Sequence, residues 1–231
     1  MGSRSMKKVL VAYATMAGST VEVAQAVSEE LTKSGFRVDV LPIPEVRDLR
    51  GYDAVVVGAP MILGWHPAAR RFLRRHRQAL QHLPLAVFVM AISLTESGET
   101  SVEGVPITLD EQLLKPPRRP ERLSFRERYA TLTNYLRPIL RAARPARPAS
   151  VGMFAGRLEY GRLKWWAVLF VMLIIQAAAG DRRNWPAIRA WAAGLPAALR
   201  LATAASGSAA PTNHWYPRAG DETTAVPYPR A

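Results

Sequence analysis

The chain has 231 residues, with 31 Lys and Arg against 18 Asp and Glu, and a formal net charge of +13 at pH 7. Its hydrophobic fraction of 49% excludes wholesale disorder, and its length favours one domain with appendages. The absence of Cys excludes disulfides, iron–sulfur clusters, thiolate zinc sites and Cys nucleophiles. Nearly all of the basic residues are Arg. This bias either reflects the nucleotide composition of the gene or indicates an anionic partner.

Strand and helix patterns alternate along most of the chain. Helical spacing of apolar residues predicts helices over 20–34, 66–80, 125–143 and 185–201. This alternation implies an α/β protein with a parallel sheet covered on both faces, and five strands favour the doubly wound order 2-1-3-4-5. The predicted strands are short apolar runs over 9–14, 36–41, 53–58, 85–92 and 151–155.

Four stretches fall outside this plan. Met1–Ser5 has the pattern of a cloning remnant, so we expect one domain over 6–203. Residues 93–123 form a long connection rich in Pro, and residues 158–180 form an apolar insertion near the fifth strand. Residues 204–231 are rich in Ala, Ser, Thr, Gly and Pro, and we expect them to be a disordered tail.

A loop of small and hydroxyl-bearing residues joins the first strand to the first helix. Amides at a helix N-terminus favour a phosphate, and Gly18 permits a tight turn. The alternative is that Ser19 is only an N-cap. The loop contains no Lys or Arg, and neither a Walker A ending nor a G-x-G-x-x-G pattern occurs, which disfavours ATP and a classical NAD domain. The candidate phosphate-binding residues are Thr15, Met16, Ala17, Gly18, Ser19 and Thr20.

Two further loops follow the third and fourth strands, at the edge where open α/β sheets bind ligands. In the first loop, Trp65 either stacks on a flat heterocycle or caps the following helix from the core. The second loop is polar and suits hydrogen bonds to a ring edge. Three such loops around one crevice fit a phosphorylated planar cofactor. The candidate residues are Pro60, Met61, Ile62, Leu63, Gly64 and Trp65, and then Ser93, Leu94, Thr95 and Glu96.

Two segments, VLVAYATMAGSTVEVAQAV and YDAVVVGAPMILGWHPAARRFL, resemble the flavodoxin superfamily. The second segment and VGMFAGRLEYGRL are similar to one branch, the menaquinone-dependent protoporphyrinogen oxidases and their flavodoxin-domain relatives. The likeness covers roughly residues 7–202 and implies FMN, held at its phosphate by 15–20 and at its ring by the 59–66 and 93–98 loops. The chain departs from the branch in the longer loop after the fourth strand, in the short GDRRNW segment and in its C-terminal tail.

The insertion contains a continuous apolar segment, Trp165–Ala179, with Gln176 as its single polar residue. A membrane-spanning helix needs about 20 apolar residues, so this segment is short for a crossing. It is either a buried helix, an interfacial helix or an oligomer interface. Peripheral contact with the inner face of the cell membrane is favoured for an otherwise cytoplasmic protein, because a quinone acceptor dissolves in lipid and basic charge suits an anionic leaflet.

A helix crowded with arginines follows the third-strand loop. Arg70 and Arg71 are the candidate substrate residues, because propionates form bidentate pairs with guanidinium groups; the alternative is a solvated face. The four His residues show no metal-ligand spacing, and no G-x-S-x-G elbow occurs, which disfavours a metal site and α/β-hydrolase chemistry. No nucleic-acid-binding signature occurs, so no nucleic acid is expected as a partner.

The sequence thus predicts an FMN-dependent oxidoreductase, with protoporphyrinogen dehydrogenation and a quinone acceptor as the activity that the resemblance implies. The flavin would carry the chemistry, so no side chain is expected to be catalytic. One alternative is an electron carrier, which the net charge disfavours, because a shuttle that docks on basic partners should be acidic. The other is a non-catalytic flavodoxin-fold protein whose apolar helix mediates assembly.

Overall fold

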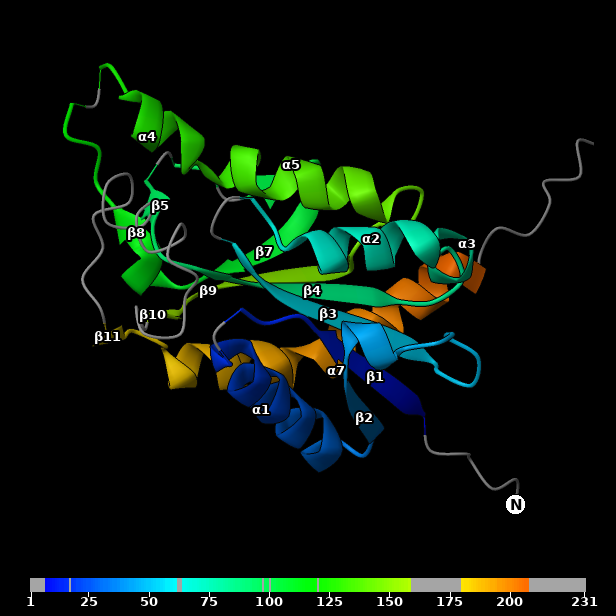
Figure 1. The fold of residues 1–231 in the computed structure, drawn as a ribbon. Coiled ribbons are helices and arrows are strands. Elements are labelled where there is room, and N and C mark those ends of the chain that lie inside the picture. The colour runs from blue at the N-terminus through cyan, green and yellow to red at the C-terminus, as the bar shows by residue number, and fades with distance from the viewer. Residues whose placement is uncertain are drawn as a thin grey trace, which may run out of the picture.

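The computed structural model describes residues 7–207 except 17, 62–63, 97, 100, 120 and 159–179. Its centre is a seven-stranded sheet in the order β2-β1-β3-β4-β9-β7-β6, with helices on both faces (Figure 1). The first five strands in this order pair in parallel and reproduce the predicted order 2-1-3-4-5. The α/β doubly wound fold predicted from the sequence is therefore confirmed.

The central strands are the most apolar parts of the chain because both of their faces are covered. Every residue of β3, β4 and β9 is buried. A parallel sheet covered on both sides has no solvent-exposed face, so its strands are continuous apolar segments. The five strands of the predicted order are β1 (Lys8–Tyr13), β2 (Arg37–Pro42), β3 (Ala54–Met61), β4 (Leu85–Ala91) and β9 (Ser150–Ala155).

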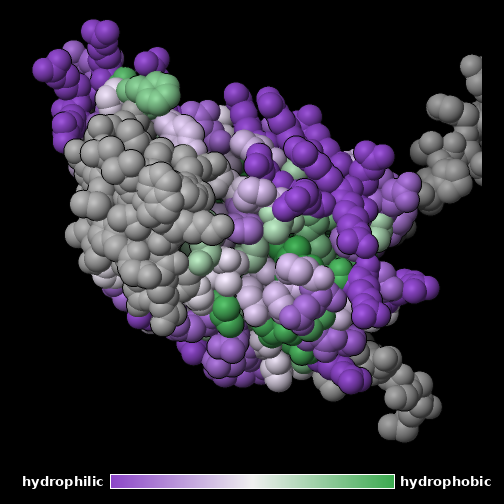
Figure 2. Space-filling view, in the orientation of Figure 1, coloured by the Kyte–Doolittle hydropathy of each residue, from purple (hydrophilic) through white to green (hydrophobic). Residues whose placement is uncertain are grey.

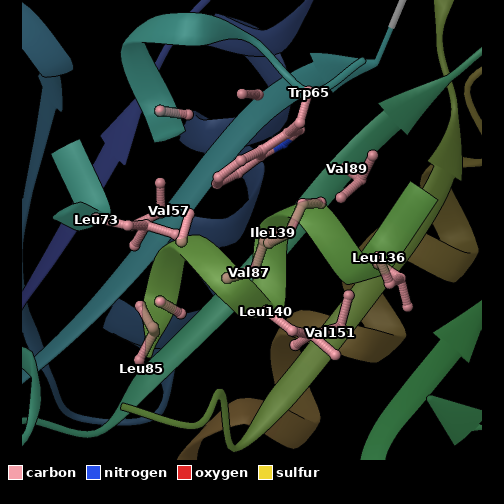
Figure 3. Packing of buried hydrophobic residues seen from close by; sticks show 14 of the residues in the cluster. Val57, Trp65, Leu73, Leu85, Val87, Val89, Leu136, Ile139, Leu140 and Val151 are labelled. Carbon is pink, nitrogen blue, oxygen red and sulfur yellow. The ribbon is translucent and has the colours of Figure 1, made fainter. Parts of the chain in front are cut away.

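Two helical layers divide the core into two clusters. One layer consists of α1 (Ser19–Lys33) and α7 (Trp185–Gly207), which pack on Val9, Val11 and Val56. The opposite layer packs on Val57 and Val87 among others (Figures 1 and 3). It contains α2 (Pro67–Arg75), α3 (Arg77–Leu80), α4 (Phe125–Tyr129) and α5 (Leu132–Ala143), and the 3-10 helix η1 (Ile43–Glu45) adjoins α2.

Helix boundaries differ from the prediction in three places. The helix predicted over 66–80 is divided at His76, and the helix predicted over 125–143 is divided between Tyr129 and Leu132. The last helix continues to Gly207, so it enters the segment predicted to be a disordered tail. The run LATAA in that stretch is dominated by residues compatible with a helix, which accounts for the extension. The rest of the tail, 208–231, lies outside the described residues.

The long connection after β4 adds strands that the five-stranded prediction did not include. It forms β5 (Leu94–Thr95), β6 (Ser101–Val102), β7 (Val105–Leu109), the 3-10 helix η2 (Glu111–Leu113) and β8 (Leu114–Lys115). Strand β7 pairs in parallel with β9 and so extends the sheet beyond the fifth predicted strand. The apolar insertion leaves β10 (Arg157–Leu158) and returns at β11 (Gly180–Asp181), which pair antiparallel.

A buried carboxylate ties this extension to the rest of the domain. Asp110, directly after β7, is 1% exposed. Its Oδ2 accepts a hydrogen bond from the Ala155 amide at 3.1 Å, and its Oδ1 accepts from Asn184 Nδ2 at 2.9 Å. Asn184 in turn accepts from the Ala187 amide in the first turn of α7. Asp110 therefore joins the ends of β7 and β9 to the start of the last helix.

Replacing this carboxylate tests whether the extension is part of the cooperative fold. We expect Asp110→Ala to lower the free energy of unfolding by about 2–3 kcal/mol, because it leaves the buried Ala155 amide and the part-buried Asn184 and Gln112 donors without an acceptor. Urea denaturation followed by circular dichroism measures the change. The control is Glu111→Ala at the neighbouring exposed position, where a shift within about 0.5 kcal/mol is expected. Equal stabilities for the two variants would contradict this role of Asp110.

Candidate functional site

The loop between β1 and α1 leaves the start of the helix without a side-chain cap. Gly18 is the N-cap residue and lies in the left-handed region, with φ 87° and ψ −20°. The hydroxyl of Thr15 accepts a hydrogen bond from the Gly18 amide at 2.8 Å and so stabilises the turn. The alternative that Ser19 is the N-cap is wrong, because Ser19 is the first residue of the helix itself.

One hydroxyl in this first turn is buried without a partner. Thr20 is 1% exposed, and its Oγ1 makes no hydrogen bond to any part of the chain that the structure describes. An unsatisfied buried polar group costs about 1–3 kcal/mol, so it marks a place where a missing partner belongs. An anion at the uncapped N-terminus would accept from this hydroxyl and from the amides of the first turn. The donors present therefore fit the phosphate of FMN; Ala17 lies outside the described residues.

Two arginines from the far end of the chain reach the same turn, which sequence reasoning missed. Arg183 Nη1 lies 2.8 Å from the Glu22 carboxylate of α1, and its Nη2 lies 2.5 Å from Asp181. Arg157 approaches Glu22 to 3.9 Å. The Arg183 guanidinium lowers the pKa of Asp181, chiefly by hydrogen bonding. These pairs offset the charge of Glu22, which would otherwise repel a phosphate bound at the helix N-terminus.

Trp65 lies in the core and not against a ring-binding crevice. Its side chain is 1% exposed and packs beside Val57, Val89 and Ile139 (Figure 3). A ring with 1% exposure has no free face to stack on a heterocycle, so Trp65 is a core residue; the helix is capped by His66 and not by Trp65, as the alternative had expected. The physical reason is the local turn: Met61 bridges to Trp65, which directs the chain back over the sheet.

The other residues predicted to contact the ring after β3 lie partly in the strand itself and partly in the loop that follows it. Pro60 and Met61 are buried residues of β3, because that strand runs three residues further than predicted. Gly64 has φ 92° and open space around its Cα, so it remains available at the edge. The predicted ring contacts Ile62 and Leu63 lie outside the described residues.

The loop after β4 supplies fewer free donors than its sequence indicates. Leu94 and Thr95 are buried and form β5. The Thr95 amide donates to Ala130 O at 2.8 Å, and the Glu96 amide donates to Lys115 O at 3.0 Å. These two amides are therefore not available to a ring edge, because the connection folds back and pairs with itself. Of the predicted residues here, Ser93 is half-buried and Glu96 carries an exposed side chain.

The start of α2, which follows the carboxyl end of β3, carries a neutral histidine and two arginines. His66 caps the helix, because its Nδ1 accepts from the Ala68 amide at 3.2 Å. Burial, together with the nearby Arg71, lowers the pKa of His66 below its usual value. The imidazole is thus neutral at pH 7 and its Nε2 carries the proton. Arg70 is half-buried and Arg71 is exposed, one turn further along.

The described residues provide neither a metal centre nor a membrane-spanning helix. Those residues include no group of three or more His, Asp or Glu side chains arranged to hold a metal ion. No described helix combines the length and hydropathy required for a membrane crossing. The segment Trp165–Ala179, on which the membrane prediction depends, lies outside the described residues.

The chain matches a known family over most of its length. Residues 10–184 match the flavodoxin domain, which is more than half of the 231 residues. The chain belongs to the flavodoxin-domain family. Membership confirms the flavodoxin resemblance and FMN as the cofactor predicted from the sequence. The match does not reach the protoporphyrinogen oxidase branch that the motifs resemble, and no curated protein matches the chain.

Solved structures similar to this flavodoxin-domain chain have low identities. An archaeal flavodoxin is 19% identical over 37% of this chain and 63% of its own length, with a TM-score of 0.35. The chain therefore spans less than two thirds of that flavodoxin. A Fusobacterium nucleatum flavodoxin bound to flavin mononucleotide is 13% identical over 80% and 93%, with a TM-score of 0.38. The flavodiiron protein of Giardia intestinalis is 12% identical over 87% and 38%, with a TM-score of 0.45.

A substitution at the N-cap separates binding from folding. We expect Gly18→Val to abolish FMN retention, because a β-branched residue disfavours the left-handed turn that directs the amides inward. Flavin absorbance per mole of purified protein measures retention. The control is Gly51→Val, which strains an equivalent left-handed position, φ 80°, in the loop before β3. Retention of flavin by Gly18→Val, or loss by both variants, would contradict the loop assignment.

Proposed function

We propose that this chain is an oxidoreductase that binds FMN non-covalently at the carboxyl ends of β1, β3 and β4. The observation that carries this proposal is the uncapped first turn of α1 with its buried, unpaired Thr20 hydroxyl. Thr15, Met16, Gly18, Ser19 and Thr20 would surround the phosphate. Gly64 and Ser93 lie at the crevice edge where the ring is expected.

When bound, FMN supplies hydride acceptance and electron transfer, and the protein supplies binding and orientation. The first turn of α1 would anchor one end of the cofactor, and the neutral His66 could donate a hydrogen bond from Nε2 at the other. Neither role requires a catalytic side chain, which agrees with the absence of a nucleophile motif. The Arg183–Glu22 pair would keep the first turn free of uncompensated negative charge.

For the substrate we propose a porphyrinogen, with a quinone as acceptor. The motifs after β3 and β9 resemble the protoporphyrinogen oxidase branch, and Arg70 and Arg71 offer two guanidinium groups at the crevice edge. Neither guanidinium forms an ion pair with a described residue, so both are available to propionates. A quinone dissolves in lipid, so we propose peripheral membrane contact through Trp165–Ala179. A second copy of the chain is the alternative partner for that segment.

Anaerobic titration tests the substrate directly. We expect protoporphyrinogen to bleach the flavin of the purified protein, and Arg70→Gln/Arg71→Gln to raise the apparent KM about 10-fold while FMN content is unchanged. The control Arg37→Gln removes an exposed charge from the start of β2 and should leave KM unchanged.

A different outcome would identify an electron carrier. In that case porphyrinogen leaves the flavin oxidised, whereas a flavin reductase reduces it and an added acceptor reoxidises it. That result would contradict the oxidase proposal and leave the FMN site intact.

A further inference from the structure

The positive charge of this protein is concentrated in one helical layer. The stretches 64–95 and 128–156, which build α2, α3 and α5, contain five arginines each and no Asp or Glu. The opposite layer has no such excess, because α1 carries three glutamates and one lysine, and α7 carries two arginines. We call the exposed arginines of α2, α3 and α5 the basic face; they are Arg71, Arg74, Arg75, Arg77, Arg137 and Arg141.

The arginines of the basic face are not used within the fold. None of the six forms an ion pair with a residue that the structure describes. Elsewhere in the described chain, Arg144 pairs with Glu103, and Arg189 pairs with both Glu29 and Glu30. Like charges three or four residues apart destabilise a helix by a few tenths of a kcal/mol per pair. The spacing of Arg71 with Arg74 and Arg75, and of Arg137 with Arg141, thus opposes folding and indicates an anionic partner.

An aromatic pair lies at one end of this layer. Phe125 and Tyr129, one turn apart on α4, are 78% and 41% exposed. The ring of Tyr129 lies 6.0 Å from that of Tyr135, which fixes α4 against α5. Figure 2 shows hydrophilic groups over the part of the surface where Figure 1 places α2, α3 and α5, and an apolar group among hydrophilic ones near α4.

We propose that the basic face binds the surface of an anionic lipid bilayer, with Phe125 entering the headgroup region. Arginine matches lipid phosphate through bidentate hydrogen bonds, and an aromatic side chain suits the membrane interface. Helices α2 and α5 pack side by side, which gives a broad face suited to a surface. This inference does not depend on the redox chemistry and uses residues other than the apolar insertion.

Two other anionic partners agree less well with the positions of the arginines and the exposed aromatic side chains. An acidic redox protein would dock close to the flavin, at the carboxyl ends of the strands, but Arg75 and Arg141 lie at the C-terminal ends of α2 and α5, away from that edge, and Arg77 follows α2 at the start of α3. Single-stranded nucleic acid is bound by aromatic platforms interleaved with basic residues along a groove. Among the residues that the structure describes, the large aromatics that are exposed lie on α4, and none lies between the arginines of α2 and α5.

Vesicle sedimentation of the full-length, FMN-loaded protein tests the proposal. We expect binding to vesicles of phosphatidylcholine with phosphatidylglycerol, weaker binding to phosphatidylcholine alone, and a decline with salt. Arg74→Glu/Arg141→Glu should weaken binding by about 25-fold or more. The matched control Lys33→Glu/Arg37→Glu makes the same charge change on the opposite side and should stay within about twofold. Phe125→Ala should weaken binding about fivefold with the salt dependence preserved.

The other outcomes each overturn the proposal. Equal binding by the two charge-reversed variants would show that the basic face is not the contact, and would leave membrane contact through the insertion standing. Binding to duplex DNA or RNA without binding to anionic vesicles, lost in Arg74→Glu/Arg141→Glu, would assign the face to nucleic acid. Porphyrinogen-dependent bleaching should be the same in both charge-reversed variants, so failure here is separable from failure of the proposed function.

Discussion

The first turn of α1 begins on a glycine in the left-handed conformation, and no side chain caps it. Most helices satisfy their first amides with Ser, Thr, Asp or Asn at the N-cap. Here the chain has a Thr hydroxyl on either side of the turn, yet Thr15 bonds to Gly18 and Thr20 is buried unpaired. The domain thereby keeps a set of unused donors at the carboxyl edge of its sheet, and the other features of the site are arranged around that set.

Two distant parts of the chain stabilise this edge from opposite sides. Arg183, which follows the insertion, contacts Glu22 in the first turn of α1. Asp110, which follows the added strand β7, holds the end of β9 and the start of α7. Both contacts join residues far apart in sequence: one ties the segment after the insertion to the first turn of α1, and the other ties the added strand β7 to β9 and α7.

Much of the fold was predictable because the strands of a doubly wound sheet are buried on both faces and therefore appear in the sequence as continuous apolar segments. The loop before α1 was predictable because it follows the first strand directly and contains a Gly suited to a left-handed turn. The position of the Trp65 side chain could not be predicted, because the sequence around it fits a ring that stacks on a ligand as well as a core residue. Strand β7 was missed because Pro106 interrupts its short run, and because it is stabilised by pairing with β9 on one side and β6 on the other, which no local pattern shows. Arg183 was missed because no local pattern shows a contact with Glu22, 161 residues away.

A comparison of two flavins tests whether the first turn of α1 binds the phosphate of FMN. Flavin-free protein should be titrated with FMN and with riboflavin, which lacks the phosphate, while flavin fluorescence is followed. About three charge-assisted hydrogen bonds should make FMN bind about 100-fold more tightly than riboflavin or better, and Thr20→Val should reduce that ratio. Equal affinities for the two flavins would contradict the account.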